Sequence, residues 1–249
     1  MNQANPKERF VALLGYWDER LEAALDTDPG FFESYLGMLA VAVDGGPLDR
    51  KTCDLVLLAA NASVTHLHAP SVSAHLSSAV LNGATKAEIL EVLQLASVLG
   101  IHGYMLGAPI LIEEARKVDP GRFRAGQREN AIREAFRSSR GYWSPLLEDL
   151  LLASPDFWEA YTAFSSHPWK TGVLPPRTKE LIYVAIDAST THLHEAGTRI
   201  HTANALRHGA APEEVLQVLQ LVSCMGMQTY LLGLPEVLAK AEASPGAKA

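Results

Sequence analysis

The sequence predicts an all-α fold built from a duplicated helical unit, on three observations. Apolar residues recur at helical spacing, and in the segment 50–62 they fall on one face. Capping signals mark where helices begin and end. Strand signals are weak, because short β-branched runs such as 41–43 have no partner that could complete a hairpin.

The chain contains an internal duplication. A Gly-Tyr-Trp triplet at 15–17 recurs at 141–143, an offset of 141 − 15 = 126 residues. The same offset aligns 65–68 with 191–194, and the correspondence runs without a gap over about a hundred residues. Two copies are too few for a solenoid. We therefore expect a first unit at 1–120, a basic, solvated linker helix at 121–140 and a second unit at 141–249.

The first part of each unit, about forty-five residues long, is expected to form two helices. Its aromatic side chains are expected to fill the core or an interface rather than to cage a ligand, because buried aromatics dominate cores and interfaces. In the first unit these aromatics are Tyr16, Trp17, Phe31, Phe32 and Tyr35.

The next part of each unit is expected to form two more helices. The first covers 50–62, with its counterpart at 177–188. The second runs from about Thr65 to Leu81 and should end at Asn82-Gly83, because glycine is favoured just past a helix end.

A strongly apolar helix should follow in each unit. Thr85 and Glu88 fit a capping box at its start, and Pro212 suits the first helical position in the second copy. A helix that is apolar nearly all round is expected inside a bundle or at a subunit interface.

Composition narrows the class of protein. The chain has 249 residues, of which 48% are hydrophobic, and this suffices for a real core. Its net charge is −7 with no basic stripe, so we expect no nucleic-acid partner. Cys53 and Cys224 form no paired motif, as in a reduced cytoplasmic protein. The start of the chain lacks a signal-peptide core, and the apolar runs are broken short of a membrane span, so we expect no membrane association.

Histidines are concentrated in one repeated motif. The sequence Thr-His-Leu-His at 65–68 and again at 191–194 is followed seven residues later by another histidine, and six of the nine histidines lie in these two copies. Histidine titrates near neutrality and binds metals, so the motif is the principal candidate for a functional site. Its histidines are His66, His68 and His75 in the first copy and His192, His194 and His201 in the second.

The segments 75–89 and 201–215 resemble the carboxymuconolactone decarboxylase and alkyl hydroperoxidase D family. Both show a histidine, a helix of small residues, a Gly-x-Thr-x-x-Glu-Ile-like turn and an apolar helix that ends in glycine. The resemblance covers roughly 48–115 and 174–241. It implies an all-helical unit that assembles into trimers or hexamers, so we expect a homo-oligomer of this fused pair, a trimer or a dimer.

The sequence departs from the peroxidase branch of that family. Where those members carry Cys-x-x-Cys, this chain has His68 and Ser71 in the first copy and His194 and Gly197 in the second. Thiol-based peroxide reduction needs a low-pKa thiolate and a resolving thiol, so we expect no such activity. The resemblance to the decarboxylase branch implies catalytic roles for His75 and His201.

The first functional hypothesis is therefore a carboxymuconolactone decarboxylase-like lyase. It would act on a small carboxylated lactone or a related ring-cleavage product by histidine acid/base catalysis, without a cofactor. His75 and His201 would be the principal residues and His68 and His194 would assist them. Asp54 and Glu180, which match the acidic residue of the family, would orient the histidines. A cation for the developing oxyanion could come from Lys51, Arg177 or Arg199.

Two alternatives remain open. In an extended segment, His-x-His points both rings to one side, so each histidine triplet could bind a divalent transition metal, with Asp54 as a further ligand in the first copy. In the other alternative the protein is a non-catalytic oligomeric binding protein, with Thr65 and Thr191 as helix N-caps. Differences between the copies, such as His102 against Gln228, leave open whether one copy or both are active.

Overall fold

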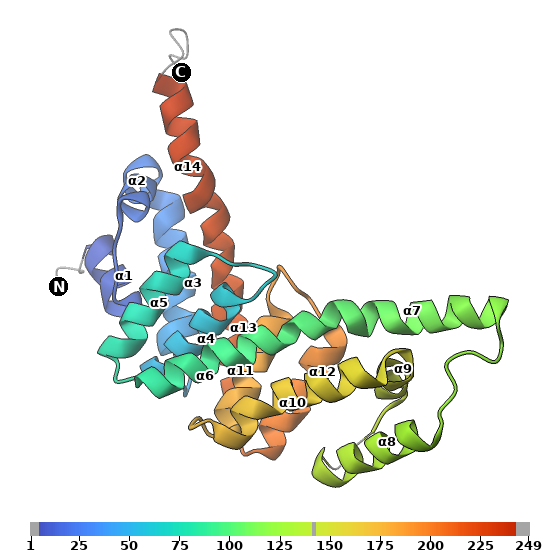
Figure 1. The fold of residues 1–249 in the computed structure, drawn as a ribbon. Coiled ribbons are helices and arrows are strands. Elements are labelled where there is room, and N and C mark those ends of the chain that lie inside the picture. The colour runs from blue at the N-terminus through green and yellow to red at the C-terminus, as the bar shows by residue number, and fades with distance from the viewer. Residues whose placement is uncertain (1–4, 141–142, 243–249) are drawn as a thin grey trace. The chain divides into compact units, whose positions relative to one another are not determined.

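The computed structural model describes residues 5–140 and 143–242 (Figure 1). Over these residues the chain forms fourteen α-helices and two short 3₁₀ helices, and no strand. The all-α prediction is confirmed. Residues 141 and 142, which belong to the second Gly-Tyr-Trp triplet, lie outside the described residues.

The chain divides into two compact units that cut across the sequence duplication. The first of these structural units combines 1–96 with 173–249, and the second holds 97–172. The two halves of the sequence duplication are called the first and second copy. The first unit therefore contains both histidine motifs. Its helices are α1 (Pro6–Leu14), α2 (Glu19–Thr27), α3 (Pro29–Asp44), α4 (Arg50–Ala62), α5 (Ala69–Leu81), α6 (Lys86–Ser97, whose last residue lies past the division), α11 (Pro176–Ala188), α12 (Glu195–Arg207), α13 (Pro212–Ser223) and α14 (Met227–Glu242), with the 3₁₀ helix η2 (Cys224–Gly226) before α14.

The first forty-four residues form three helices rather than the expected two. Gly15 ends α1 in the left-handed conformation (φ 76°), which glycine adopts without strain, and Asp18 caps the next helix. The expected core role holds for Phe32, which is fully buried, whereas Phe31 is half exposed and its ring contacts that of Tyr230.

Helices α4 and α11, which are equivalent in the two copies, pack against each other at the centre of this unit (Figure 1). Both have the predicted extents to within one residue. Each is buried along most of its length, and α4 packs against α5 as α11 packs against α12. These two helix pairs place the histidine motifs, because each motif lies between the two helices of its pair.

Each copy also supplies a side chain that bonds the backbone just before the other copy's central helix. Gln217 on α13 accepts from the Leu48 amide (2.8 Å) and donates to the carbonyls of Ala42 and Val43 (both 3.1 Å). The equivalent residue on α6, at 217 − 126 = 91, is Glu91.

Glu91 accepts from the amides of Val173 and Leu174 and pairs with Lys179 at 2.6 Å. Glu91 and Lys179 are both buried. Buried polar groups are costly when unpaired, so these bonds hold the two copies together.

Helices α5 and α6 are joined as predicted. Gly83 follows α5 with φ 86°, and Thr85 and Glu88 form the capping box by reciprocal bonds of 3.2 and 2.7 Å. The apolar helices are not buried all round, however: Leu90 on α6 and its equivalent Leu216 on α13 are about half exposed.

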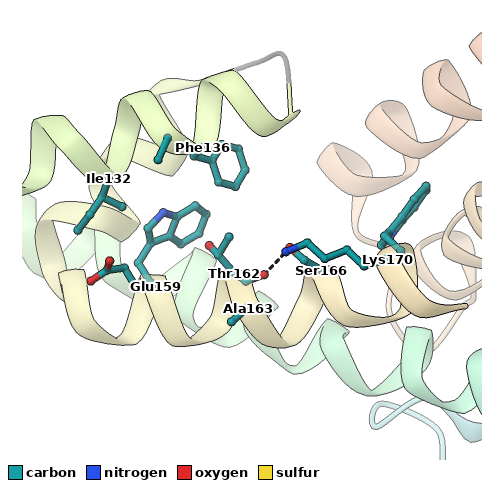
Figure 2. A pocket seen from close by; sticks show the side chains of 10 residues that line it. Ile132, Phe136, Glu159, Thr162, Ala163, Ser166 and Lys170 are labelled. Carbon is teal, nitrogen blue, oxygen red and sulfur yellow. Dashed lines mark hydrogen bonds between the residues drawn. The ribbon is translucent and has the colours of Figure 1, made fainter.

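The second unit contains η1 (Val98–Ile101), α7 (His102–Val118), α8 (Gln127–Arg140), α9 (Pro145–Ala153) and α10 (Pro155–Thr171). Its core gathers Leu150, Leu151 and Trp158, and the Tyr104 hydroxyl donates to the Leu150 carbonyl at 2.9 Å. A cavity of about 540 Å³ lies between α8 and α10 (Figure 2).

Two helical stretches, Lys86–Val118 and Pro212–Ala241, are long and apolar enough to cross a membrane by length and composition. The expectation that every apolar run falls short of a span is wrong on that measure. Core helices of soluble proteins share this property, and 39% of the most apolar window in each stretch is buried inside the fold.

Candidate active site

The histidine motif forms a tight turn. The amides of His66 and Leu67 both donate to the Ser63 carbonyl at 2.9 Å, and Leu67 has φ 48°. Helix α5 starts only at Ala69, with His68 as its N-cap residue. The prediction that this helix starts near Thr65 is therefore wrong, because the Ser63 carbonyl takes both amides and reverses the chain.

The second copy repeats this turn. Leu193 also has φ 48°, the Ser189 carbonyl takes the amides of His192 and Leu193, and α12 starts at Glu195. Thr65 and Thr191 are not N-caps, and the histidine pairs do not lie in extended backbone. Even so, the turn brings the two rings of each pair to 5.7 Å between centroids.

The turn also places the histidines beside a residue that the sequence analysis missed. The amide of His68 donates to the Asn61 carbonyl, and that of His194 donates to the Asp187 carbonyl. Asn61 and Asp187 are equivalent and both are fully buried. The signal that could have found them is a polar residue repeated at the apolar end of α4 and α11.

In the second copy, His201 and Glu180 form a close pair. His201 Nδ1 donates to Glu180 Oε2 at 2.6 Å, and Asn204 donates to the other carboxylate oxygen at 3.1 Å. Glu180 is buried, whereas the His201 side chain keeps 21% exposure. Because the carboxylate holds Nδ1–H, the Nε2 lone pair of the neutral ring is directed away from Glu180.

Asp187 lies on the other side of that ring. Its Oδ2 is 3.9 Å from His201 Nε2, and its Oδ1 is 3.6 Å from His192 Nε2. Burial raises the pKa of Asp187 to about 7, with Glu180 adding to the rise and His201 opposing it. Burial also lowers the pKa values of His192 and His194.

The equivalent pair in the first copy is built differently. His75 Nδ1 is 3.6 Å from Asp54 Oδ1, and among the described residues it has no hydrogen-bond partner. The other oxygen of Asp54 accepts instead from Ser78 and Asn82, both at 2.8 Å. The His75 side chain is 5% exposed, and the ring of Tyr16 packs edge-on against it.

The other first-copy histidines belong to a closed hydrogen-bond network centred on Gln228. The Gln228 amide donates to Asn61 Oδ1 (2.7 Å) and Ser71 Oγ (2.9 Å), and its carbonyl oxygen accepts from His66 Nε2 at 2.6 Å. The Ser71 hydroxyl, which accepts from the amide, also forms a hydrogen bond with His68 Nδ1 at 2.8 Å.

The cations considered for oxyanion stabilisation are held elsewhere by carboxylates. Lys51 pairs with Glu88 (2.9 Å), Arg177 with Glu214 (2.7 Å) and Arg199 with Glu195 (2.9 Å).

The two cysteines are buried free thiols. Burial raises the pKa of Cys53 to about 12 and that of Cys224 to about 11. Neither thiol is activated as a peroxidase nucleophile would need to be.

The cavity of the second unit has a different character. Ile132 and Phe136 from α8 face α10, and none of the residues that line the cavity is a histidine (Figure 2). The repeated histidines lie outside this cavity, in the first unit.

A duplicated all-α chain with a histidine–carboxylate pair at the same position in each copy matches a known class. The carboxymuconolactone decarboxylase family model matches residues 29–101 and 155–229, and the chain belongs to that family. The two matched segments confirm the duplication and the family resemblance.

A solved structure is similar over nearly the whole chain. It is the crystal structure of a protein from Burkholderia xenovorans LB400, provisionally described as a gamma-carboxymuconolactone decarboxylase subunit. The identity is 39%, the TM-score is 0.90, and the match covers 97% of this chain and 99% of that one. No curated protein matches the chain.

Proposed function

We propose that the protein is a decarboxylase-like lyase acting on a small carboxylated lactone or a related ring-cleavage product, and that the second copy carries the reaction. The observation that supports this most is the 2.6 Å bond between His201 and Glu180, which is shielded by burial of the carboxylate while the imidazole stays accessible. The decarboxylase-like relative supports the reaction class.

The reaction needs a proton at carbon. Cleavage of the bond to the carboxylate releases CO₂ and leaves the electron pair on carbon, as an enolate conjugated with the lactone carbonyl. His201, protonated on both nitrogens, delivers the Nε2 proton to that carbon and is reprotonated from solvent. Glu180 holds the ring in place and stabilises its imidazolium form. The assisting role expected of His194 stays a prediction.

The test is CO₂ release from a panel of carboxylated lactones by His201→Gln, with His75→Gln as the matched control in the first copy. General acid–base catalysis contributes about 10²–10⁴-fold, so we expect His201→Gln to lose about a hundredfold or more in kcat/KM. His75→Gln should stay within a few-fold of the parent protein. Full activity in a folded His201→Gln would overturn the assignment.

We also propose that the chain assembles into a homo-oligomer through its apolar helices. Leu90, Leu216 and Leu232 are 48%, 53% and 72% exposed, which supports a further apolar contact on these faces. Light scattering coupled to size exclusion tests this directly: a monomer at micromolar concentration would contradict it.

A further inference from the structure

One cluster in the second copy, made by Asp187, His192 and His194, has the composition of a metal site. One ligand atom from each lies within 4.8 Å of those from the other two. Asp187 is fully buried and the histidines are partly buried. Two imidazoles and one carboxylate are a common ligand set for zinc, iron and other divalent transition metals.

The spacing between the ligand atoms also suits an ion. Asp187 Oδ1 and His192 Nε2 are 3.6 Å apart, which is too long for a good hydrogen bond. Two ligands bound at about 2.1 Å in a tetrahedral site would be about 3.4 Å apart. Small side-chain movements would therefore close these atoms around an ion.

Gly197 lets Asp187 and His194 pack directly against the backbone beside the cluster. A Cβ atom at this position would come within 2.0 Å of Asp187 Oδ2 and 2.5 Å of His194 Nδ1. His194 Nδ1 at present accepts the Gly197 amide at 3.1 Å, a bond that ligation by this nitrogen would replace. Any residue with a Cβ at this position would push both ligand atoms out of their present places.

The first copy fills the equivalent space with neutral groups. Asn61 stands where the second copy has Asp187, and Ser71 stands where it has Gly197. The Gln228 amide nitrogen lies 2.7 Å from Asn61 Oδ1 and 2.9 Å from Ser71 Oγ. An amide donor therefore satisfies these oxygens from the position where an ion would be bound, and the carboxylate that would neutralise an ion is gone.

We propose that the second copy binds one divalent transition-metal ion through Asp187, His192 and His194, and that the first copy binds none. The ligands differ from the histidine triplets expected from the sequence, because Asp187 replaces the distant histidine of the motif. The inference goes beyond the proposed lyase activity and does not depend on it.

The test is titration of the chelator-stripped protein with Co²⁺, followed by calorimetry and by the visible ligand-field bands of the bound ion. We expect one equivalent per chain. Asp187→Asn, which installs the residue of the first copy, should weaken binding at least a hundredfold, whereas the matched double variant His66→Ala/His68→Ala should keep one equivalent. Three results would overturn the proposal: equal binding by the parent protein and Asp187→Asn, no binding by the parent protein, or two equivalents per chain.

A second variant tests the position of the ion without removing a ligand. The Cβ atom of Gly197→Ser should displace Asp187 Oδ2 and His194 Nδ1 and so abolish the Co²⁺ bands, with the helical circular dichroism unchanged. A parent-like spectrum in this variant would contradict the assigned position. Because no substrate is present in these titrations, their outcome is separate from that of the lyase assay.

Discussion

The two histidine turns have the same backbone and different chemistry. Leu67 and Leu193 share φ 48°, and each histidine pair has its rings 5.7 Å apart. In the first copy an amide network closes around the rings. In the second copy the Asp187 carboxylate lies beside His192, and Glu180 accepts from His201 on the next helix. The comparison teaches that the fold preserves the turn, while a few polar substitutions change the groups that surround its histidines.

The largest expected effect concerns the carboxylates that face His201 and His75. Glu180→Gln removes the charge that stabilises the His201 imidazolium, so kcat on a carboxylated lactone should fall by about two orders of magnitude. Asp54→Asn in the first copy should change kcat by only a few-fold. Steady-state assays of both folded variants decide this, and equal losses would abolish the distinction between the copies.

The next largest effect concerns Glu91 and its equivalent Gln217. Both bond the backbone ahead of a central helix, but only Glu91 is charged. Glu91→Ala leaves Lys179 buried without its carboxylate, so it should reduce the free energy of unfolding by about 3–5 kcal/mol. Gln217→Ala removes neutral bonds only and should cost about 1–3 kcal/mol. Urea unfolding measures both, and a larger loss in Gln217→Ala would contradict this order.

The amide network of the first copy should contribute mainly to stability. Gln228→Ala leaves Asn61 and Ser71 without their shared donor, so the free energy of unfolding should fall by about 1–3 kcal/mol while lyase activity persists. Ser223→Ala is the control, because among the described residues its exposed hydroxyl bonds only the Leu219 carbonyl. It should change stability by less than about 0.5 kcal/mol. Loss of activity without loss of stability in Gln228→Ala would argue for a working first site.

The smallest effect is expected at the two thiols. A pKa of about 12 for Cys53 and about 11 for Cys224 keeps both protonated at pH 8, since the thiolate forms only as the pH rises towards those values. Neither thiol should react with a maleimide or disulfide probe until the protein is unfolded. Fast labelling of the native chain at pH 8 would show that one thiol is accessible and activated.

The sequence predicted what local signals encode. The extents of α4 and α11, the capping box at Thr85 and the left-handed Gly83 follow from apolar spacing and capping chemistry. The start of α5 was mispredicted because Leu67 adopts a positive φ, which residue type does not signal and which the Ser63 carbonyl enforces.

Which residues meet at the site depends on contacts between residues that are far apart in the sequence. Gln228 is 162 residues away from its partner His66, and no local pattern could connect them. Asp187 was not predicted, because its equivalent in the first copy is the neutral Asn61 and only the fold places this buried carboxylate beside the histidines. In both cases the folded chain decides which polar residues meet.

The most direct test of the account compares two chains that each keep one intact site. In one, Asp54→Asn and His75→Gln disable the first copy, and in the other, Glu180→Gln and His201→Gln disable the second. The rate of CO₂ release per chain from a carboxylated lactone should remain above about half of the parent value in the former and fall to about 1% or less in the latter. A loss of about half in each chain would contradict the account, because it would mean that both copies carry working sites.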